Sequence, residues 1–106
     1  MSLIVISSVG YNGVLTKEQT MNIDITFRHM EHTVALDQMI REKSVKFSKW
    51  FGPSAQVHWI CWMEGIDHCS EVSIHAGADK YFAKAHSDDL YKTFDLIVHK
   101  IQNQIM

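Results

Sequence analysis

This 106-residue chain is poor in cysteine, has no long apolar run and has no excess of positive charge. Its two cysteines form no Cys-x-x-Cys pair, which suits a reducing compartment and requires no disulfide. No run approaches the ~20 apolar residues that span a bilayer. The apolar run Leu3–Ile6 has no basic residue before it, which argues against a secretory signal. We therefore expect a cytoplasmic protein without a membrane segment.

The sequence also lacks the motifs of common enzymes. It contains no Gly-x-Ser-x-Gly, no phosphate-binding glycine loop and no Cys/His pair in a recognisable context. Glu64 and Asp67 flank a predicted turn, where acidic residues are common for backbone reasons. We expect no enzymatic activity, no cofactor and no small-molecule substrate.

The net charge restricts any interaction with nucleic acid. Ten Lys and Arg face twelve Asp and Glu, a formal charge of −2, and leaving out residues 1–20 does not change this balance. Nucleic-acid-binding proteins usually carry a basic excess. A nucleic-acid surface on this chain must therefore come from segregation of charge, to which seven histidines add positive charge as the pH falls.

Alternation of apolar and polar residues predicts four strands. They lie at residues 23–28, 56–63 and 70–76, with a fourth after Asp79. Residues 65–68 are the predicted turn between the second strand and the third. Residues 77–79 precede the fourth strand.

Two segments have the period of an amphipathic helix. The first begins at His32 or Thr33 and ends at Phe51, before Gly52-Pro53. The second follows Ser87-Asp88-Asp89, which offers an N-cap and negative charge for the first turn. Its apolar stripe consists of Leu90, Phe94, Ile97, Val98, Ile101 and Ile105.

The element order β-α-β-β-β-α predicts an α+β fold. A right-handed crossover from the first strand to the second places the first helix on one face of the sheet. The last helix has a single apolar stripe, so it must pack on that face too. We expect a four-stranded sheet with two helices packed on one face over residues 21–106. Residues 1–20 are either an extra strand, with a hairpin signal at Asn12-Gly13, or an addition before a natural start at Met21.

Several segments, in the same order, resemble the ribosome hibernation-promoting factor family, also called ribosome-associated inhibitor A or sigma-54 modulation proteins. Met21–Thr26 resembles the first strand of the family, and His29–Leu36 resembles its turn into the first helix. Lys43–Phe51 resembles the end of that helix, and Asp88–Ile101 resembles the closing helix. The resemblance covers residues 21–105 and is to the short form of the family.

This resemblance implies a non-enzymatic, ribosome-associated translation inhibitor. Such a protein binds the 16S rRNA of the small ribosomal subunit, in the mRNA and tRNA channel, during starvation or stationary phase. Family members hold rRNA phosphates with basic side chains, mainly along the helices. By matching position, the resemblance implies this role for Lys43, Lys46 and Lys100, and for Lys49 as in some members.

Other basic residues are candidates without a matching position in the family, namely Lys84, Arg28 and Arg41. Asn103 stands where the family commonly has Arg, and Trp62 stands where it often has Lys. Many members also continue into a lysine-rich tail, whereas this sequence stops at Met106. Because each departure removes positive charge, we expect weaker and less salt-dependent RNA binding than in a typical member.

Lys43, Lys46 and Lys49 recur every three residues and form a strip along one flank of the first helix. A lysine is a mobile point charge that suits phosphate and carries no information on base identity. The spacing by itself favours a solvated helix face, and the family resemblance favours a phosphate-binding surface.

The sheet face opposite the helices has an unusual predicted composition. Strand parity places there Trp62, Phe82, His58, His75, Ile60, Ser73, Lys84, His86 and Arg28. Such a face could stack unpaired bases. We prefer a face covered by a homodimer partner or by residues 1–20, because exposed apolar patches are usually small. The alternative function is therefore a homodimeric protein-interaction module with weak or no RNA binding.

The histidines and cysteines of the strands raise two further possibilities, a metal site and a disulfide. His58, His75 and His86 could together hold zinc, but nothing in their spacing requires it, and we expect no metal site. Cys61 is predicted to face the helices and Cys69 to face away, so we expect no disulfide between them.

Overall fold

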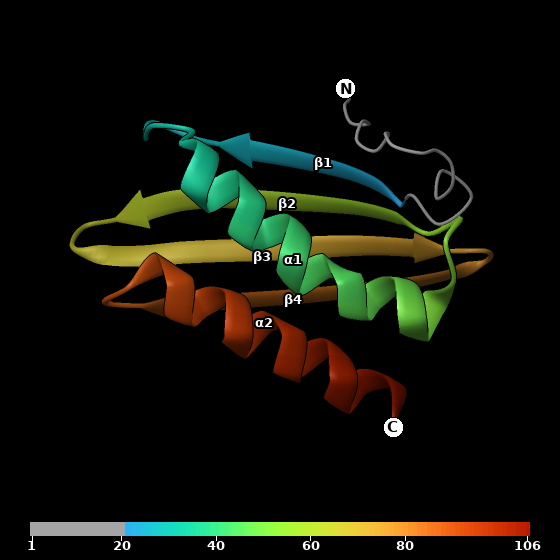
Figure 1. Ribbon diagram of the computed structural model, residues 1–106. Coiled ribbons are helices and arrows are strands. Elements are labelled where there is room, and N and C mark those ends of the chain that lie inside the picture. The colour runs from blue at the N-terminus through green and yellow to red at the C-terminus, as the bar shows by residue number, and fades with distance from the viewer. Residues whose placement is uncertain (1–20) are drawn as a thin grey trace.

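The structure, a computed structural model, describes residues 21–106, so the extension and the hairpin expected within residues 1–20 lie outside the described residues. The elements are β1 (Asn22–Phe27), α1 (Val34–Phe51), β2 (Gln56–Glu64), β3 (Asp67–Ala76), β4 (Asp79–Ser87) and α2 (Leu90–Ile105). Figure 1 shows a single sheet with both helices on one of its faces. The predicted α+β fold and its β-α-β-β-β-α order are confirmed.

The four strands lie in the order β1-β2-β3-β4. β1 runs parallel to β2, and the other neighbours are antiparallel. A parallel pair cannot be joined by a tight turn, so α1 supplies the crossover between β1 and β2. This crossover places α1 over the sheet.

The turn between β2 and β3 is shorter than predicted. Asp67 and His68 are already paired with Glu64 and Met63, which leaves a two-residue turn of Gly65 and Ile66. Gly65 has φ +61°, which glycine adopts without strain. A two-residue turn with positive φ at its first central residue matches the twist of the flanking strands, so the strands continue into residues expected to be loop.

Both helices begin at side-chain caps. Thr33 accepts a hydrogen bond from the Leu36 backbone N–H at 3.1 Å, and Asp89 accepts one from the Tyr91 N–H at 2.9 Å. α1 ends at Gly52, which has φ +90° and donates its N–H to the Ser48 carbonyl at 2.9 Å. Of the three candidate caps for α2, Asp89 is therefore the one used.

Trp59, on β2, is the side chain that links the sheet to both helices. It is fully buried, and its Nε1–H donates to Ser44 Oγ of α1 at 2.9 Å. Its ring stacks on that of Phe47 of α1, with 6.1 Å between the ring centroids. It meets the ring of Phe94 of α2 edge-on, with 5.6 Å between the centroids. The Ser44 hydroxyl in turn donates to the Ile40 carbonyl at 2.8 Å. The buried indole therefore has its hydrogen-bond partner, as a buried polar group requires.

Both cysteines are free, as expected. Cys61 faces the helices and is fully buried, which raises the pKa of its thiol to about 12. Cys69 lies on the opposite face, as strand parity predicts, yet it is only 1% exposed. Its cross-strand neighbours on that face are Trp62 and His86. Burial and the negative charges of Glu64 and Asp67 raise the pKa of Cys69.

The sheet face away from the helices, called the free face below, carries every second residue of each strand. From β1 to β4 these are Asn22, Asp24 and Thr26; Gln56, His58, Ile60, Trp62 and Glu64; Asp67, Cys69, Glu71, Ser73 and His75; and Lys80, Phe82, Lys84 and His86. Within residues 21–106, no helix is long and apolar enough to cross a membrane.

The Ser44 hydroxyl provides a test of this core. Ser44→Ala leaves the buried Trp59 indole N–H without a partner, which costs about 1–3 kcal/mol of unfolding free energy. Ser48→Ala is the matched control on α1, because the Ser48 hydroxyl is exposed and donates only to the Val45 carbonyl. Its expected cost is within ~0.5 kcal/mol. Urea denaturation measures both, and equal costs would contradict the role of Ser44.

Candidate nucleic-acid interface

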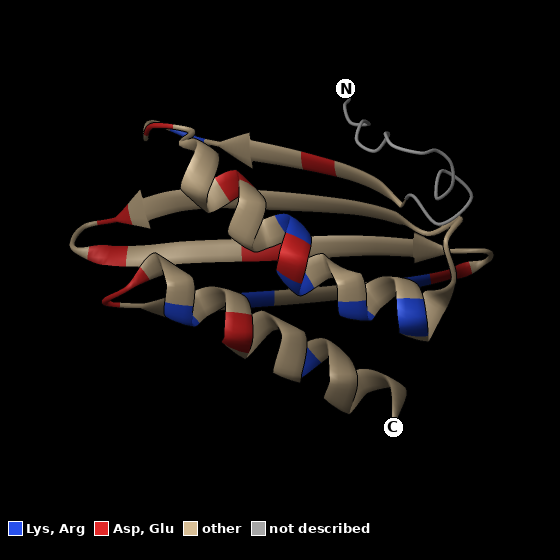
Figure 2. Cartoon of the chain, in the orientation of Figure 1, with Lys and Arg blue, Asp and Glu red and all other residues tan. Residues whose placement is uncertain are grey.

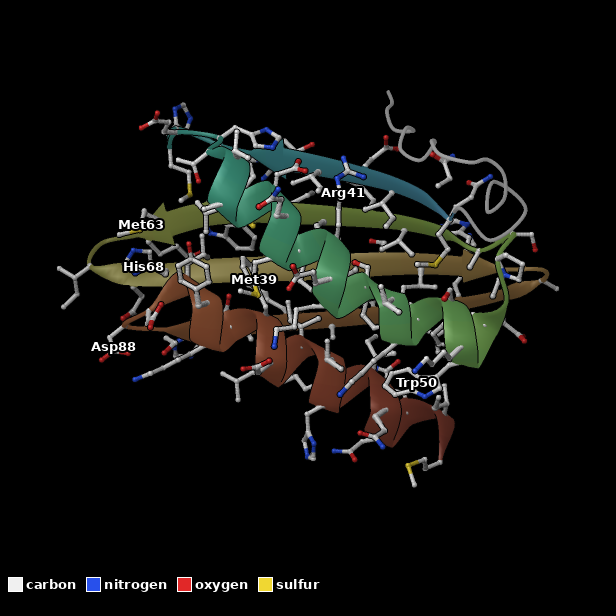
Figure 3. The ribbon with its side chains drawn as sticks, in the orientation of Figure 1. Met39, Arg41, Trp50, Met63, His68 and Asp88 are labelled. Carbon is white, nitrogen blue, oxygen red and sulfur yellow. The ribbon has the colours of Figure 1, made fainter. Side chains whose placement is uncertain are left out.

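Acidic residues gather at one end of the molecule. The β1–α1 loop, the β2–β3 turn and the β4–α2 loop all lie at this end (Figure 1). Their acidic residues are Glu31, Glu64, Asp67, Asp88 and Asp89. Figure 2 shows this concentration in red, and Figure 3 shows His68 and Asp88 at the same end. Much of the negative charge is thus kept away from the other ends of the helices.

The C-terminal halves of the two helices are basic. In α1 the only charged residues after Glu42 are Lys43, Lys46 and Lys49, and in α2 the only one after Asp95 is Lys100. The helices contact one another and run in the same direction across the sheet (Figure 1), so these halves lie together. The blue bands in Figure 2 mark this surface. The charge is therefore segregated, which a net-negative chain needs if it is to bind a polyanion.

An open groove runs between the two helices within this basic region. Its volume is about 420 Å³. It is lined by Glu42, Lys43 and Lys46 of α1 and by Asp95, Val98, His99 and Gln102 of α2. Ammonium, imidazole and amide groups are the donors that suit a phosphate. The groove thus places such donors from both helices at one site.

Lys43 is not a free cation. Its Nζ lies 2.6 Å from Asp95 Oδ1 across the helix–helix contact. The Asp95 side chain is 69% exposed and that of Lys43 is 33% exposed. A solvent-screened pair of this kind contributes only about 0–1 kcal/mol. A phosphate can therefore compete with Asp95 for Lys43, but part of the attraction is lost in doing so.

Lys46 and Lys49 are the available cations of the strip. Within residues 21–106, neither forms an ion pair. Lys49 lies in the last turn of α1, where the helix dipole also favours a positive charge. These two lysines provide the least compensated positive charge on the helix layer.

Lys100 is turned toward the edge of the sheet. Its Nζ donates to the Lys84 carbonyl of β4 at 2.6 Å, and Gln104 Nε2 donates to the Phe82 carbonyl at 2.6 Å. Both bonds satisfy carbonyls of an edge strand, which would otherwise be open to another chain. Lys100 keeps its charge and two further N–H donors at the margin of the basic surface.

The remaining basic candidates lie elsewhere. Lys84 is on the free face, with Nζ 5.2 Å from the centre of the Trp62 ring. Arg28 directly follows β1, and its parity with Thr26 assigns it to the free face as well. The six predicted rRNA-binding residues therefore do not form one surface: Lys43, Lys46, Lys49 and Lys100 lie on the helix layer, and Lys84 and Arg28 do not.

Arg41 is held in a local ion-pair network. Its Nε lies 2.6 Å from Asp37 Oδ2, and His32 Nε2 lies 2.8 Å from Asp37 Oδ1. Burial works to raise the pKa of Asp37, but the hydrogen bonds and charges of Arg41 and His32 outweigh it and lower that pKa. Figure 3 shows Arg41 on the side of α1 away from α2. Arg41 thus lies apart from the groove.

The predicted sheet-face residues lie together on the free face, where Phe82 is 51% exposed. His58 Nε2 is 3.2 Å from Thr26 Oγ1, and Trp62 Nε1–H donates to Glu64 Oε2 at 3.0 Å. His75, His58 and His86 belong to three different cross-strand rows, so their imidazoles do not converge. In the described part of the chain, no three His, Cys, Asp or Glu side chains are grouped as a metal site.

Asp95, His99 and Gln102 line the groove, although no pattern in the sequence marks them as site residues. Helical period places Asp95 and His99 on the polar face of α2. It does not show which part of that face meets α1, because this depends on how the two helices cross.

Comparison with known sequences gives a family. A sequence profile described as Sigma 54 modulation protein / S30EA ribosomal protein matches residues 23–106. The ribosome hibernation promoting factor of Escherichia coli strain K12 is 27% identical over 85 residues, which are 80% of this chain and 90% of that protein. Ribosome-associated factor Y of Haemophilus influenzae is also 27% identical over 85 residues, 80% of this chain and 79% of that protein.

Solved structures share the fold. The N-terminal domain of Thermus thermophilus Protein Y superposes with a TM-score of 0.74 at 19% identity, covering 80% of this chain and 96% of that one. A ribosomal subunit interface protein from Coxiella burnetii superposes with a TM-score of 0.69 at 24% identity, covering 79% and 92%. These similarities extend through both helices and the sheet.

The Lys43–Asp95 pair gives a prediction for RNA binding. Asp95→Asn releases Lys43, so RNA affinity rises and the slope of log K against log salt steepens by about 0.7–0.9. Asp24→Asn makes the same change in net charge on the free face and is the matched control. Fluorescence anisotropy with labelled RNA across a salt series measures both. Equal effects of the two variants would show that only net charge matters.

Proposed function

Because this chain belongs to the sigma 54 modulation protein / S30EA ribosomal protein family, we propose that it is a ribosome hibernation factor acting on the small ribosomal subunit. Its relatives include proteins named ribosome hibernation promoting factor. The observation that carries the proposal is the gathering of Lys43, Lys46, Lys49 and Lys100 on the helix layer of a chain whose net charge is negative. The helix layer is the surface that meets 16S rRNA.

The contact with rRNA is electrostatic. Lys46 and Lys49 meet phosphates directly, and a phosphate in the groove draws Lys43 away from Asp95. His99 and Gln102 supply further donors on the α2 side. Lysine–phosphate contacts carry no information on base identity, so the shape of the folded rRNA determines where the protein binds.

The acidic end orients the protein on the subunit. Glu31, Glu64, Asp67, Asp88 and Asp89 repel phosphates, so the C-terminal halves of the helices approach the RNA first. Two to four lysine–phosphate contacts correspond to a salt slope of about −2 to −4. This is a modest value, and binding should weaken noticeably as the salt concentration rises.

Inhibition requires no chemistry. The described domain measures 43 × 32 × 18 Å, which is large enough to occupy a channel that otherwise holds mRNA and the anticodon ends of tRNA. Occupation of that channel in the cytoplasm, during starvation or stationary phase, stops translation by steric exclusion. The protein therefore acts by occupying the channel reversibly and not as an enzyme.

Charge reversal on the groove tests this function. Lys43→Glu with Lys46→Glu abolishes co-sedimentation of the full chain with small subunits, because attraction to phosphate becomes repulsion. Circular dichroism should show an intact fold, since neither lysine is part of the core. Lys80→Glu with Lys84→Glu makes the same charge change on the free face and should leave most of the binding.

The two pairs together decide which face meets the RNA. Loss of binding by the Lys80 and Lys84 pair, with binding retained by the Lys43 and Lys46 pair, would place the RNA on the free face. That result would contradict the proposed surface.

A further inference from the structure

We propose that the free face is a self-association surface, on which a second copy of this chain packs through a twofold axis parallel to the strands. The face carries three large apolar side chains, Ile60 and Trp62 on β2 and Phe82 on the edge strand β4, of which Phe82 is half exposed. Exposed aromatic groups gathered on one face are typical of interaction sites.

Trp62 is held in place before any partner arrives. Its indole N–H donates to Glu64 at 3.0 Å, and the Lys84 ammonium lies 5.2 Å from the centre of its ring. An aromatic side chain that is already fixed loses little conformational entropy on binding. Trp62 is therefore suited to be the main anchor of the interface.

The charges on the free face differ between its two edges. Asp24 is on β1, at one edge, and Lys80 and Lys84 are on β4, at the other. Pairing across the sheet sets Asp24, His58, Ser73 and Phe82 in one row. Lys80 and Lys84 flank Phe82 on β4, so they lie on either side of the row that contains Asp24.

The unequal charges of the two edges favour one orientation of the twofold axis in a symmetric dimer. A twofold axis parallel to the strands puts β1 of one copy over β4 of the other and keeps the rows aligned. Asp24 of each copy then meets the partner between Lys80 and Lys84, and the symmetry makes this contact twice. The same axis places Glu64 of each copy opposite the partner's Asp67 at the end of the face, which opposes association. An axis perpendicular to the strands would instead put β1 over β1 and β4 over β4, so that Asp24 would not meet the partner's lysines.

The area available fits a reversible dimer. Strands about 4.8 Å apart, with a rise of about 3.3 Å per residue, give this four-stranded face a footprint of roughly 600 Å² in each copy. The total, roughly 1,200 Å², is at the lower limit for specific interfaces. We expect association on the order of micromolar concentrations, in the range of transient complexes.

The composition of the face does not favour RNA as the occupant. Lys80 and Lys84 are opposed by Asp24 and Glu71 on the face and by Glu64 and Asp67 at its end. Such a mixed surface lacks the basic excess that attracts a polyanion. In the dimer the helix layers point outward, so the groove between α1 and α2 stays accessible.

Sedimentation velocity of the full chain, over concentrations from micromolar to submillimolar, tests the proposal. The expected result is a reversible shift from 12.2 kDa toward twice that mass. Trp62→Glu should weaken association by at least about tenfold, the loss expected of an interface anchor. Leu96→Glu, an exposed apolar position on α2, is the matched control and should have no effect.

A charge swap tests the axis and does not depend on Trp62. Asp24→Lys weakens association, because it then faces two lysines. Asp24→Lys combined with Lys80→Asp and Lys84→Asp restores it. These residues are exposed, so the variants should fold even if Trp62→Glu does not.

Three results would overturn the proposal. They are a monomer at every concentration, association unchanged by Trp62→Glu, and a charge swap that fails to restore association. Loss of RNA binding by Trp62→Glu in a protein that stays monomeric would assign the face to RNA instead. Ribosome binding is measured separately, so failure here leaves the function of the helix layer untouched.

Discussion

The packing of both helices against one face of the sheet is the constraint on which the rest of this structure depends. Trp59 joins the three elements, because it contacts Phe47 of α1 and Phe94 of α2 and donates its indole N–H to Ser44. With all the helical cover on one side, the other face of the sheet is left for other uses. The same packing brings together the C-terminal halves of the helices, which carry the lysines, and forms the groove between α1 and α2.

Segregation of charge gives a chain with a formal charge of −2 a locally basic surface. Five acidic residues lie at one end of the molecule, and the lysines without an acidic partner lie in the second halves of the helices. Within the groove, Asp95 neutralises Lys43, so the surface is only moderately basic. Under the proposed function, fewer phosphate contacts allow easier release from rRNA.

The sequence alone was sufficient for most of the fold. Alternation, helical period and the helix starts expected at His32 or Thr33 and after Ser87-Asp88-Asp89 depend on residues close together in the chain, and these expectations match the structure. The β2–β3 turn was expected to include Asp67 and His68. Their pairing with Glu64 and Met63 depends on the partner strand and is apparent only in the structure. The contacts within the candidate site could be predicted less well. The contact of Lys43 with Asp95 and that of Lys100 with the Lys84 carbonyl depend on how the helices pack, which no local pattern encodes.

The most direct test of the central claim is co-sedimentation of the full chain with purified small ribosomal subunits across a salt series. The helix-layer surface predicts saturable binding of one copy per subunit, with a log–log salt slope of about −2 to −4. Absence of saturable binding at low salt, from a protein shown to be folded, would contradict the ribosomal role. Binding that did not change with salt would contradict the lysine–phosphate contacts.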